Sequence, residues 1–330
     1  MKFLVIQNAF IGDVILATAV AEKLYQNYPA SKIDFLLRKG NEELFKKHPF
    51  IHEVIVWDKK NGKYKNLFRI LTKVRGAKYD YIINLHRFGS SGFITAFSGS
   101  KYKIGFDKNP FSFLFTRKII HEIGNGKHET ERNHLLIKDL TDSQIGKPKL
   151  YPSKEDYEIS AKISGQQPNS PYICIAPTSV WFTKQFPKEK WVELINTLDN
   201  SLKVYLLGAS NDFSACEEIR NGVINKEPEK IMNLAGKLSL LQTAALMKQA
   251  KMNYVNDSAP MHIASAMNAP VTAVFCSTIP SFGFGPLSYH STIVETKEKL
   301  DCRPCGLHGY KICPKGHYQC ALSIEIKNII

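Results

Sequence analysis

The sequence predicts an α/β protein made of two doubly wound domains. Short apolar runs alternate with amphipathic helical stretches from residue 2 onward, and the same alternation starts again at residue 172. Such alternation is typical of parallel sheets that are covered by helices. The chain has 330 residues, which is enough for two domains of about 150 residues, each with its own core.

The first half contains four expected strands and three expected helices. The strands are apolar runs at residues 2–7, 32–38, 51–58 and 79–86. The helices have apolar residues at helical spacing and lie at 13–29, 41–49 and 64–78.

A second series of elements follows residues 164–171, which are rich in Gly, Pro, Ser and Asn and which we interpret as a linker. Strands are expected at 172–177, 203–208, 230–236, 251–256 and 270–276, and helices at 187–200, 212–223, 239–250 and 260–268. The predicted domains are therefore residues 1–163 and 172–330.

The positive charge of the chain is concentrated in its first half. The formal net charge is +14, and residues 1–150 hold 26 basic against 14 acidic side chains, whereas residues 151–330 hold 18 against 16. This asymmetry favours an anionic partner for the first half, such as nucleic acid, an anionic lipid surface or a phosphorylated glycolipid. A lysine-rich surface that is merely solvated would give the same count.

Two further features concern membranes. Residues 59–78 form a basic, helix-like segment with an apolar stripe, which fits either a helix lying on a membrane surface or a helix that covers the sheet. No apolar run approaches the roughly 18 residues of a membrane span, and the first residues resemble a strand more than a signal peptide. We therefore expect a cytoplasmic protein.

The stretch VNDSAPMHIASA, residues 255–266, is the first candidate site. Here a buried strand ends in Asp257 and Ser258, and a helix begins at once with Pro260 near its start. Either polar side chain could cap the helix, and the remaining N–H groups would suit a phosphate. Ligands of doubly wound sheets bind at this end of the strands. A helix that is simply capped, with no ligand, is the alternative.

Two more strand ends carry polar residues. The strand at 172–177 leads into Thr178 and Ser179, followed by Lys184, whose ammonium could neutralise a phosphate. With the turn at 257–258 they indicate a nucleotide diphosphate. After the first strand, Gly12 allows close approach of the backbone, and Asp13 is either a helix N-cap or a general base.

Several well-known motifs are missing from the sequence. It contains no P-loop, no G-x-G-x-x-G after a strand, no G-x-S-x-G elbow and no D-x-D pair. A P-loop enzyme, a nicotinamide cofactor and an acidic metal–nucleotide clamp are therefore not expected.

These segments resemble the heptosyltransferases, family nine of the bacterial glycosyltransferases. The matching stretches are IGDVILATAVAEKL, HETERNHLLI at 128–137, APTSVWFTKQFPKEKWVELI at 176–195, and residues 233–275 with their NDSAPMH block. The resemblance implies a GT-B fold, in which two Rossmann-like domains face a central cleft. The first domain would bind the acceptor and the second the nucleotide sugar.

The resemblance also implies a mechanism and its residues. Transfer would proceed with inversion, without a metal ion or other cofactor, from ADP-heptose to an anionic glycolipid such as inner-core lipopolysaccharide, on the cytoplasmic face of the inner membrane. Asp13 would be the base. The implied donor contacts are Thr178, Ser179, Lys184, Asp257, Ser258, Ala259, Met261 and His262, and the implied acceptor-side residues are Gly12, His128 and Arg132.

Four of the seven cysteines lie close together near the C-terminus: Cys302, Cys305, Cys313 and Cys320. Four thiolates are enough for tetrahedral zinc, which would be structural here, and similar tails occur in some members of this family. Four reduced, unliganded cysteines are the alternative, because disulfides are rare in the cytoplasm.

Other functions remain possible on the sequence alone. The protein could transfer another sugar, use another acceptor, or bind a sugar nucleotide without catalysis. A nucleic-acid partner is not expected, because the sequence lacks a basic–aromatic RNA motif and a recognition helix.

Overall fold

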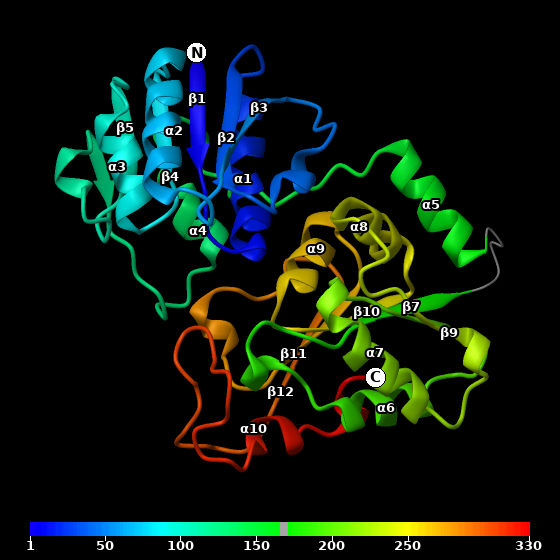
Figure 1. Ribbon diagram of the computed structural model, residues 1–330. Coiled ribbons are helices and arrows are strands. Elements are labelled where there is room, and N and C mark those ends of the chain that lie inside the picture. The colour runs from blue at the N-terminus through cyan, green and yellow to red at the C-terminus, as the bar shows by residue number, and fades with distance from the viewer. Residues whose placement is uncertain (166–170) are drawn as a thin grey trace. The chain divides into compact units, whose positions relative to one another are not determined.

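The computed structural model describes residues 1–165 and 171–330 (Figure 1). It divides into two compact units, Met1–Tyr151 and Pro152–Ile330, and each unit is built around one six-stranded parallel sheet. The predicted α/β class and the doubly wound character of both halves are confirmed.

The first unit has the strand order β3-β2-β1-β4-β5-β6. Its strands are β1 (Lys2–Ile6), β2 (Lys32–Arg38), β3 (Ile51–Trp57), β4 (Tyr81–Asn84), β5 (Tyr102–Phe106) and β6 (Arg117–Ile119). Its α-helices are α1 (Ile11–Asn27), α2 (Lys63–Ala77), α3 (Gly89–Phe97) and α4 (Glu129–His134). The expected helix at 41–49 is only a short 3-10 turn, η1 (Glu42–Phe45), and α3 to α4 were not predicted.

The helix α2 settles the two readings of the basic segment 59–78. Its apolar stripe, Leu67, Ile70, Leu71 and Val74, is buried, and three of these residues join a core cluster with strands of the sheet. This helix therefore covers the sheet, and the reading in which that stripe lies on a membrane is wrong. The buried stripe is the face of α2 that packs on the sheet.

The second unit has the strand order β12-β11-β10-β7-β8-β9. Its strands are β7 (Tyr172–Ala176), β8 (Lys203–Leu206), β9 (Ile231–Asn233), β10 (Met252–Asn256), β11 (Val271–Phe275) and β12 (Ser291–Glu295). Its helices are α5 (Lys154–Ser164), α6 (Lys188–Thr197), α7 (Phe213–Gly222), α8 (Leu240–Gln249), α9 (Ala259–Met267) and α10 (Gln319–Leu322).

The burial of β1 and β7 agrees with their central places in parallel sheets. All five residues of β7 are buried, as are Phe3 to Ile6 of β1, which is expected for a strand covered by helices on both faces. Trp57 and Trp191, one in each unit, are fully buried. Each buried side chain of this size stabilises its unit by a few kcal/mol.

The boundary between the units lies earlier than the sequence suggested. The helix α5 falls in the second unit, where it packs against α8 and where Tyr205 donates a hydrogen bond to Ile163 O at 3.1 Å. The expected first domain of 1–163 therefore ends too late. Most of the expected linker, 164–171, lies outside the described residues.

No helix in the described part of the chain has both the length and the apolar character that a membrane crossing requires.

Candidate active site

In both sheets the strand order reverses between the first and fourth strands of the unit. The reversal lies between β1 and β4 in the first unit and between β7 and β10 in the second. Ligands of such sheets bind outside the carboxyl ends of the strands at this point, because the two following loops diverge there. Each unit therefore has one candidate edge, and the polar strand ends found in the sequence lie on these edges.

At the edge of the second unit, Asn256 joins the two loops. Its side-chain nitrogen donates to Pro177 O at 2.8 Å, and its side-chain oxygen accepts the backbone N–H of Phe186 at 2.8 Å. Asn256 is fully buried, so these bonds are shielded from water. They fix the start and the end of the loop 177–186, which carries Thr178, Ser179 and Lys184.

Lys184 and Asp257 form an ion pair at this edge. The Lys184 Nζ lies 2.6 Å from Asp257 Oδ2, and their side chains are 14% and 7% exposed. The Thr278 hydroxyl donates to the same carboxylate oxygen at 2.6 Å. The ammonium is thus held in a defined position by the ion pair, while 14% of the Lys184 side chain is exposed.

The N-terminus of α9 lies directly after Asp257. Its N-cap residue is Ser258, whose side chain makes no capping hydrogen bond to the residues that the structure describes. The sequence allowed Asp257 or Ser258 to cap this helix, but the Asp257 carboxylate accepts from Thr278 and pairs with Lys184. The helix therefore begins without a side-chain cap, and its first turn retains the partial positive charge that attracts an anion.

The other expected donor contacts divide into half-buried and buried residues. Thr178, Ser179, Ser258 and Ala259 are half-buried at the ends of the strands. The Met261 side chain is 0% exposed and therefore buried in the core, and the backbone N–H of this residue donates to Ser258 O at 3.1 Å. His262 is also buried, at 6% exposure.

At the edge of the first unit, Asp13 lies in the first turn of α1. The N-cap of this helix is Phe10. Asp13 is therefore not the helix N-cap, which was one of the two roles that the sequence left open for it. Gly12 precedes it in the same turn, and both residues are half-buried. A carboxylate at this position is favoured by the helix dipole.

A buried ion pair lies within electrostatic reach of Asp13. Arg132 Nε donates to Glu129 Oε2 at 2.8 Å, and both side chains are almost fully buried. Burial raises the pKa of Glu129 to about 7; Arg132 opposes this rise and the Asp13 charge adds to it. Arg132 is thus directed at Glu129, and sequence reasoning did not identify Glu129. His128 is the N-cap of α4 and accepts the N–H of Thr130 at 3.2 Å.

Three cations that sequence reasoning missed follow the strands of this unit. Arg38 ends β2, Lys59 comes after β3 and Arg87 comes after β4. Burial lowers the pKa of Lys59, and the charges of Arg38 and Lys63 lower it further. Burial also lowers the pKa of His86 to about 3, helped by Lys59 and Arg87, so this imidazole is neutral at physiological pH. Listing the charged residues that follow each strand would have found this basic edge.

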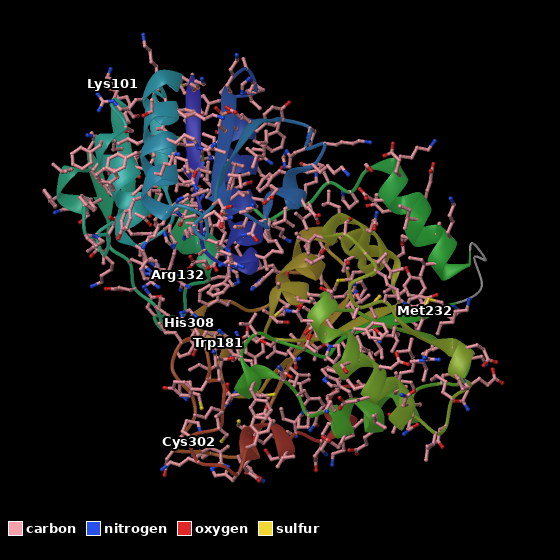
Figure 2. The ribbon with its side chains drawn as sticks, viewed as in Figure 1. Lys101, Arg132, Trp181, Met232, Cys302 and His308 are labelled. Carbon is pink, nitrogen blue, oxygen red and sulfur yellow. The ribbon has the colours of Figure 1, made fainter. Side chains whose placement is uncertain are left out.

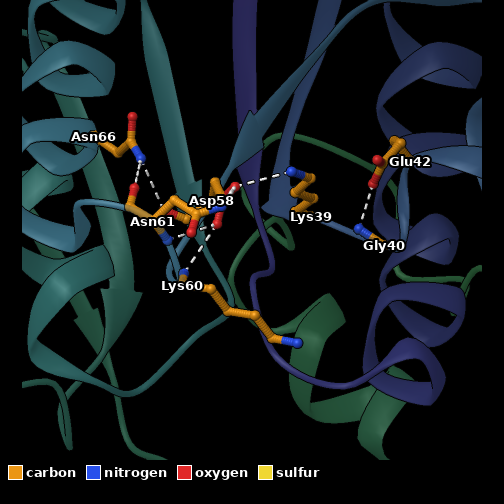
Figure 3. A network of polar contacts seen from close by, with 7 residues as sticks. All are labelled: Lys39, Gly40, Glu42, Asp58, Lys60, Asn61 and Asn66. Atoms are coloured by element: carbon orange, nitrogen blue, oxygen red, sulfur yellow. Dashed lines mark hydrogen bonds and ion pairs between the residues drawn. The ribbon is translucent and has the colours of Figure 1, made fainter.

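Next to Arg38 and Lys59 in the chain, a network of polar contacts links the residues that follow β2 and β3 (Figure 3). Lys39 pairs with Asp58 at 3.0 Å, and Asp58 also accepts the backbone N–H groups of Lys60 and Asn61 at 2.9 and 3.2 Å. The Lys39 hydrogen bond, with these N–H groups, lowers the pKa of Asp58 to about 2. The network orders the loop that positions Lys59, whose Nζ donates to Asn8 O at 3.1 Å.

The four C-terminal cysteines line one cavity of about 220 Å³. Burial raises the pKa of Cys320 to about 11 and also raises the pKa of Cys305, and the neighbouring thiols add to both shifts. Nowhere among residues 1–165 and 171–330 do three His, Cys, Asp or Glu side chains lie close enough together to hold a metal ion. Zinc in this cavity would require the sulfur atoms to move closer.

Comparison with known proteins identifies the family. The model of glycosyltransferase family 9 (heptosyltransferase) matches residues 67–309. The chain belongs to this family. It is therefore a glycosyltransferase, as the resemblance implied.

Individual relatives agree with this assignment. The chain is 28% identical over 280 residues to lipopolysaccharide heptosyltransferase 3 of Escherichia coli, covering 82% of both chains. It is 25% identical over 316 residues to lipooligosaccharide heptosyltransferase 2 of Haemophilus ducreyi, covering 89% of this chain and 88% of the relative. The structure of E. coli ADP-heptose lps heptosyltransferase II is similar with a TM-score of 0.82, at 22% identity, over 100% of this chain and 96% of that one. This similarity confirms the GT-B class.

Proposed function

We propose that this glycosyltransferase moves a heptose from ADP-heptose to an inner-core lipopolysaccharide-type acceptor, with inversion and without a metal ion. The observation that carries the donor side is the Lys184–Asp257 pair beside the uncapped N-terminus of α9, at the strand reversal of the second unit. The names of the relatives support heptose, and an E. coli heptosyltransferase with a TM-score of 0.70 is described with ADP.

The second unit would bind the donor and stabilise the leaving group. As the bond between the anomeric carbon and the diphosphate breaks, negative charge grows on the terminal phosphate oxygen. The first turn of α9 and the Lys184 ammonium would meet that charge, with Thr178 and Ser179 as hydroxyl donors. Because these groups are held before the reaction, little reorganisation is needed in the transition state.

The first unit would bind the acceptor and remove its proton. The acceptor hydroxyl loses its proton to the Asp13 carboxylate as its oxygen forms the new bond to the anomeric carbon. The strand-end cations Arg38, Lys59 and Arg87 favour an anionic acceptor. Arg132 and His128 are the acceptor residues expected from the sequence. Arg132 is almost fully buried and would act indirectly, by holding Glu129 in their ion pair. His128 would act indirectly as the N-cap of α4.

A lipid-linked acceptor requires contact with a membrane surface, and we propose that the protein is cytoplasmic and binds the inner membrane peripherally. The outer face of α2 presents Tyr64 and Phe68, which are 70% and 58% exposed, between the cations Lys63, Lys65 and Arg69. Exposed aromatic rings among cations suit the interface of an anionic bilayer.

Structural zinc at the four C-terminal cysteines stays a prediction. The shared cavity supports it, and the present spacing of the thiols does not. Elemental analysis of protein purified without added metal or chelator measures it directly.

A family member with another donor or acceptor is the second candidate. The donor edge, which is our name for the carboxyl ends of β7 and β10 with Lys184 and the first turn of α9, would bind a diphosphate and does not select a particular sugar. A panel of nucleotide sugars in a thermal-shift assay separates the two, since a ligand that binds the folded state raises its melting temperature. A larger shift with a UDP- or GDP-sugar than with ADP-heptose would overturn the proposed donor.

Asp13→Asn tests the catalytic role. Transfer should fall about 10²–10⁴-fold, the usual contribution of a general base. The fold should persist, because asparagine keeps the size of the side chain and caps helices about as well as aspartate. ADP affinity should stay unchanged, because the proposed donor site belongs to the other unit. The control is Glu189→Gln, which removes a carboxylate from the first turn of α6. A folded Asp13→Asn enzyme with parental turnover would show that Asp13 is not the base and would favour a purely structural role.

A further inference from the structure

The residue before Lys184 is held by a distant segment of the chain. Thr183 is 1% exposed, and its hydroxyl oxygen accepts the N–H of Tyr310 at 2.7 Å and the hydroxyl of Ser277 at 3.0 Å. Its own N–H donates to Tyr310 O at 3.0 Å. Tyr310 belongs to residues 302–320, which contain the four clustered cysteines and which we name the cysteine lobe. Figure 2 labels one residue of each segment, Trp181 and His308.

The cysteine lobe also holds the other end of the ion pair. Arg303 donates to Cys276 O and to Thr278 O, both at 2.7 Å, and it pairs with Glu295 at 2.6 Å. The Thr278 hydroxyl in turn donates to Asp257. Polar contacts thus run from the lobe through Thr278 and Asp257 to Lys184, and the peptide bond to Thr183 leads back to the lobe. Both partners of the Lys184–Asp257 pair are fixed by the same segment.

The lobe also touches the stem of Lys184. Gly309 has a φ of +77°, and a Cβ added there would lie 2.9 Å from Thr183 Oγ1 and 3.0 Å from Lys184 Cγ. Only glycine tolerates this backbone conformation at such a close approach. The lobe therefore restricts the Lys184 side chain sterically, in addition to holding its neighbour by hydrogen bonds.

We propose that Thr183 is a positioning residue through which the cysteine lobe aims the Lys184 ammonium at the donor diphosphate. The inference rests on the proposed donor site. It assigns to the lobe a part in the transfer reaction that does not require a metal ion. Thr183 also lines the cavity of the four cysteines, so it adjoins both this cavity and Lys184.

The test compares Thr183→Val, which keeps the shape but removes the acceptor oxygen, with Thr183→Ser, which retains it. Thr272→Val is the matched control: Thr272 is 2% exposed in the same unit, and its hydroxyl bonds only to Met252 Sδ among the described partners. Two readouts are needed. One is the dissociation constant for ADP. The other is the acetylation rate of Lys184 by acetic anhydride, measured by mass spectrometry against Lys190 as an internal reference.

Thr183→Val should raise the ADP dissociation constant about tenfold, the effect of one hydrogen-bonded contact. It should also raise Lys184 acetylation several-fold, because the ammonium leaves Asp257. Thr183→Ser and Thr272→Val should stay within about twofold of the parent in both readouts. In a Lys184→Gln background, Thr183→Val should change ADP affinity by less than about twofold, since neighbouring residues that act through one another are not additive.

Two outcomes would overturn the proposal. One is parental acetylation and ADP affinity in Thr183→Val, even with a lowered melting temperature. The other is an equal loss of affinity in the Lys184→Gln background. If the parent does not bind ADP, the proposed donor is wrong, and the acetylation rates alone then decide whether Thr183 positions Lys184.

Discussion

At the scale of single residues, the first unit contains a buried carboxyl group, that of Glu129, whose pKa is affected by the proposed base Asp13. Glu129 is buried, and its pKa rises from 4.5 to about 7 because burial disfavours its charge and Asp13 repels it. A carboxyl group with a raised pKa in the folded state stabilises the fold fully below pH 4.5 and loses this stabilisation as the pH rises to about 7.

Glu129→Gln should change the pH dependence of stability. The amide stays neutral at every pH, so the variant should not share the parent's loss of stability. As the pH rises from 4.5 to 7.5, the unfolding free energy of the variant relative to that of the parent should increase by on the order of 3 kcal/mol. Urea unfolding at several pH values measures this. Asp13→Asn should move the parental loss toward lower pH, because one repelling charge is gone. Parallel stability curves for the parent and Glu129→Gln would contradict the raised pKa.

The sequence identified single residues better than it identified their partners. Lys184 and Asp257 were both expected at the donor edge, but their ion pair was not, because the residues are far apart in the chain. Glu129 stands within the HETER motif and was missed, since only its burial distinguishes it from a surface glutamate. The cations Arg38 and Lys59 were hidden among many surface lysines of the first half.

At the scale of elements, β10 carries one buried asparagine toward each end. Asn253 donates to Met247 O at 2.9 Å and to Pro270 O at 2.8 Å, whereas Asn256 ties down the donor loop 177–186. Both side chains are 0% exposed. The two residues are alike in chemistry and burial, but their hydrogen bonds hold segments at opposite ends of β10.

Replacing these asparagines should separate stability from donor binding. Asn253→Ala and Asn256→Ala should each cost about 1–3 kcal/mol of unfolding free energy, because buried partners lose their hydrogen bonds. Only Asn256→Ala should weaken ADP binding, as it frees the loop that carries Lys184. Chemical denaturation and ADP titration of both variants measure the two effects. Equal ADP affinities would exclude the loop as part of the donor site.

The elements that the sequence predicted are those with a strong period or a long apolar run. The central strands β1 and β7 and the helix α1 belong to this group. The strands β5, β6 and β12 were missed because they are short and mix polar with apolar residues at the side of the sheet away from the centre. The short helix α4 was missed for the same reason, although it carries Glu129 and Arg132.

At the scale of the whole molecule, the excess of positive charge belongs to the unit that would meet the acceptor. Residues 1–150 account for +12 of the net +14. Apolar groups accompany this charge: the Phe68 and Phe93 rings lie 5.8 Å apart, Phe93 lies 6.0 Å from Phe111, and the next turn presents Phe113, which is 72% exposed.

Binding to anionic vesicles should depend on both features. Lys65→Glu with Arg69→Glu should weaken binding to vesicles that contain phosphatidylglycerol at least tenfold, because each cation near such a surface contributes about 1 kcal/mol. Phe68→Ala with Phe113→Ala should weaken it independently of salt. Co-sedimentation at low and high salt measures both, and Lys248→Glu with Lys251→Glu in the second unit is the control. Undiminished binding by the first pair would remove this face as the membrane contact.

The early boundary between the units has a practical consequence for dissecting the enzyme into halves. A cut placed by sequence after residue 163 would leave α5 on the wrong fragment, strip α8 of its neighbour, and remove the Ile163 carbonyl that accepts from Tyr205. A cut between Tyr151 and Pro152 keeps these contacts in one polypeptide. Separate expression of 1–151 and 152–330 should therefore give soluble fragments where a split at 163 would give an aggregating C-terminal half.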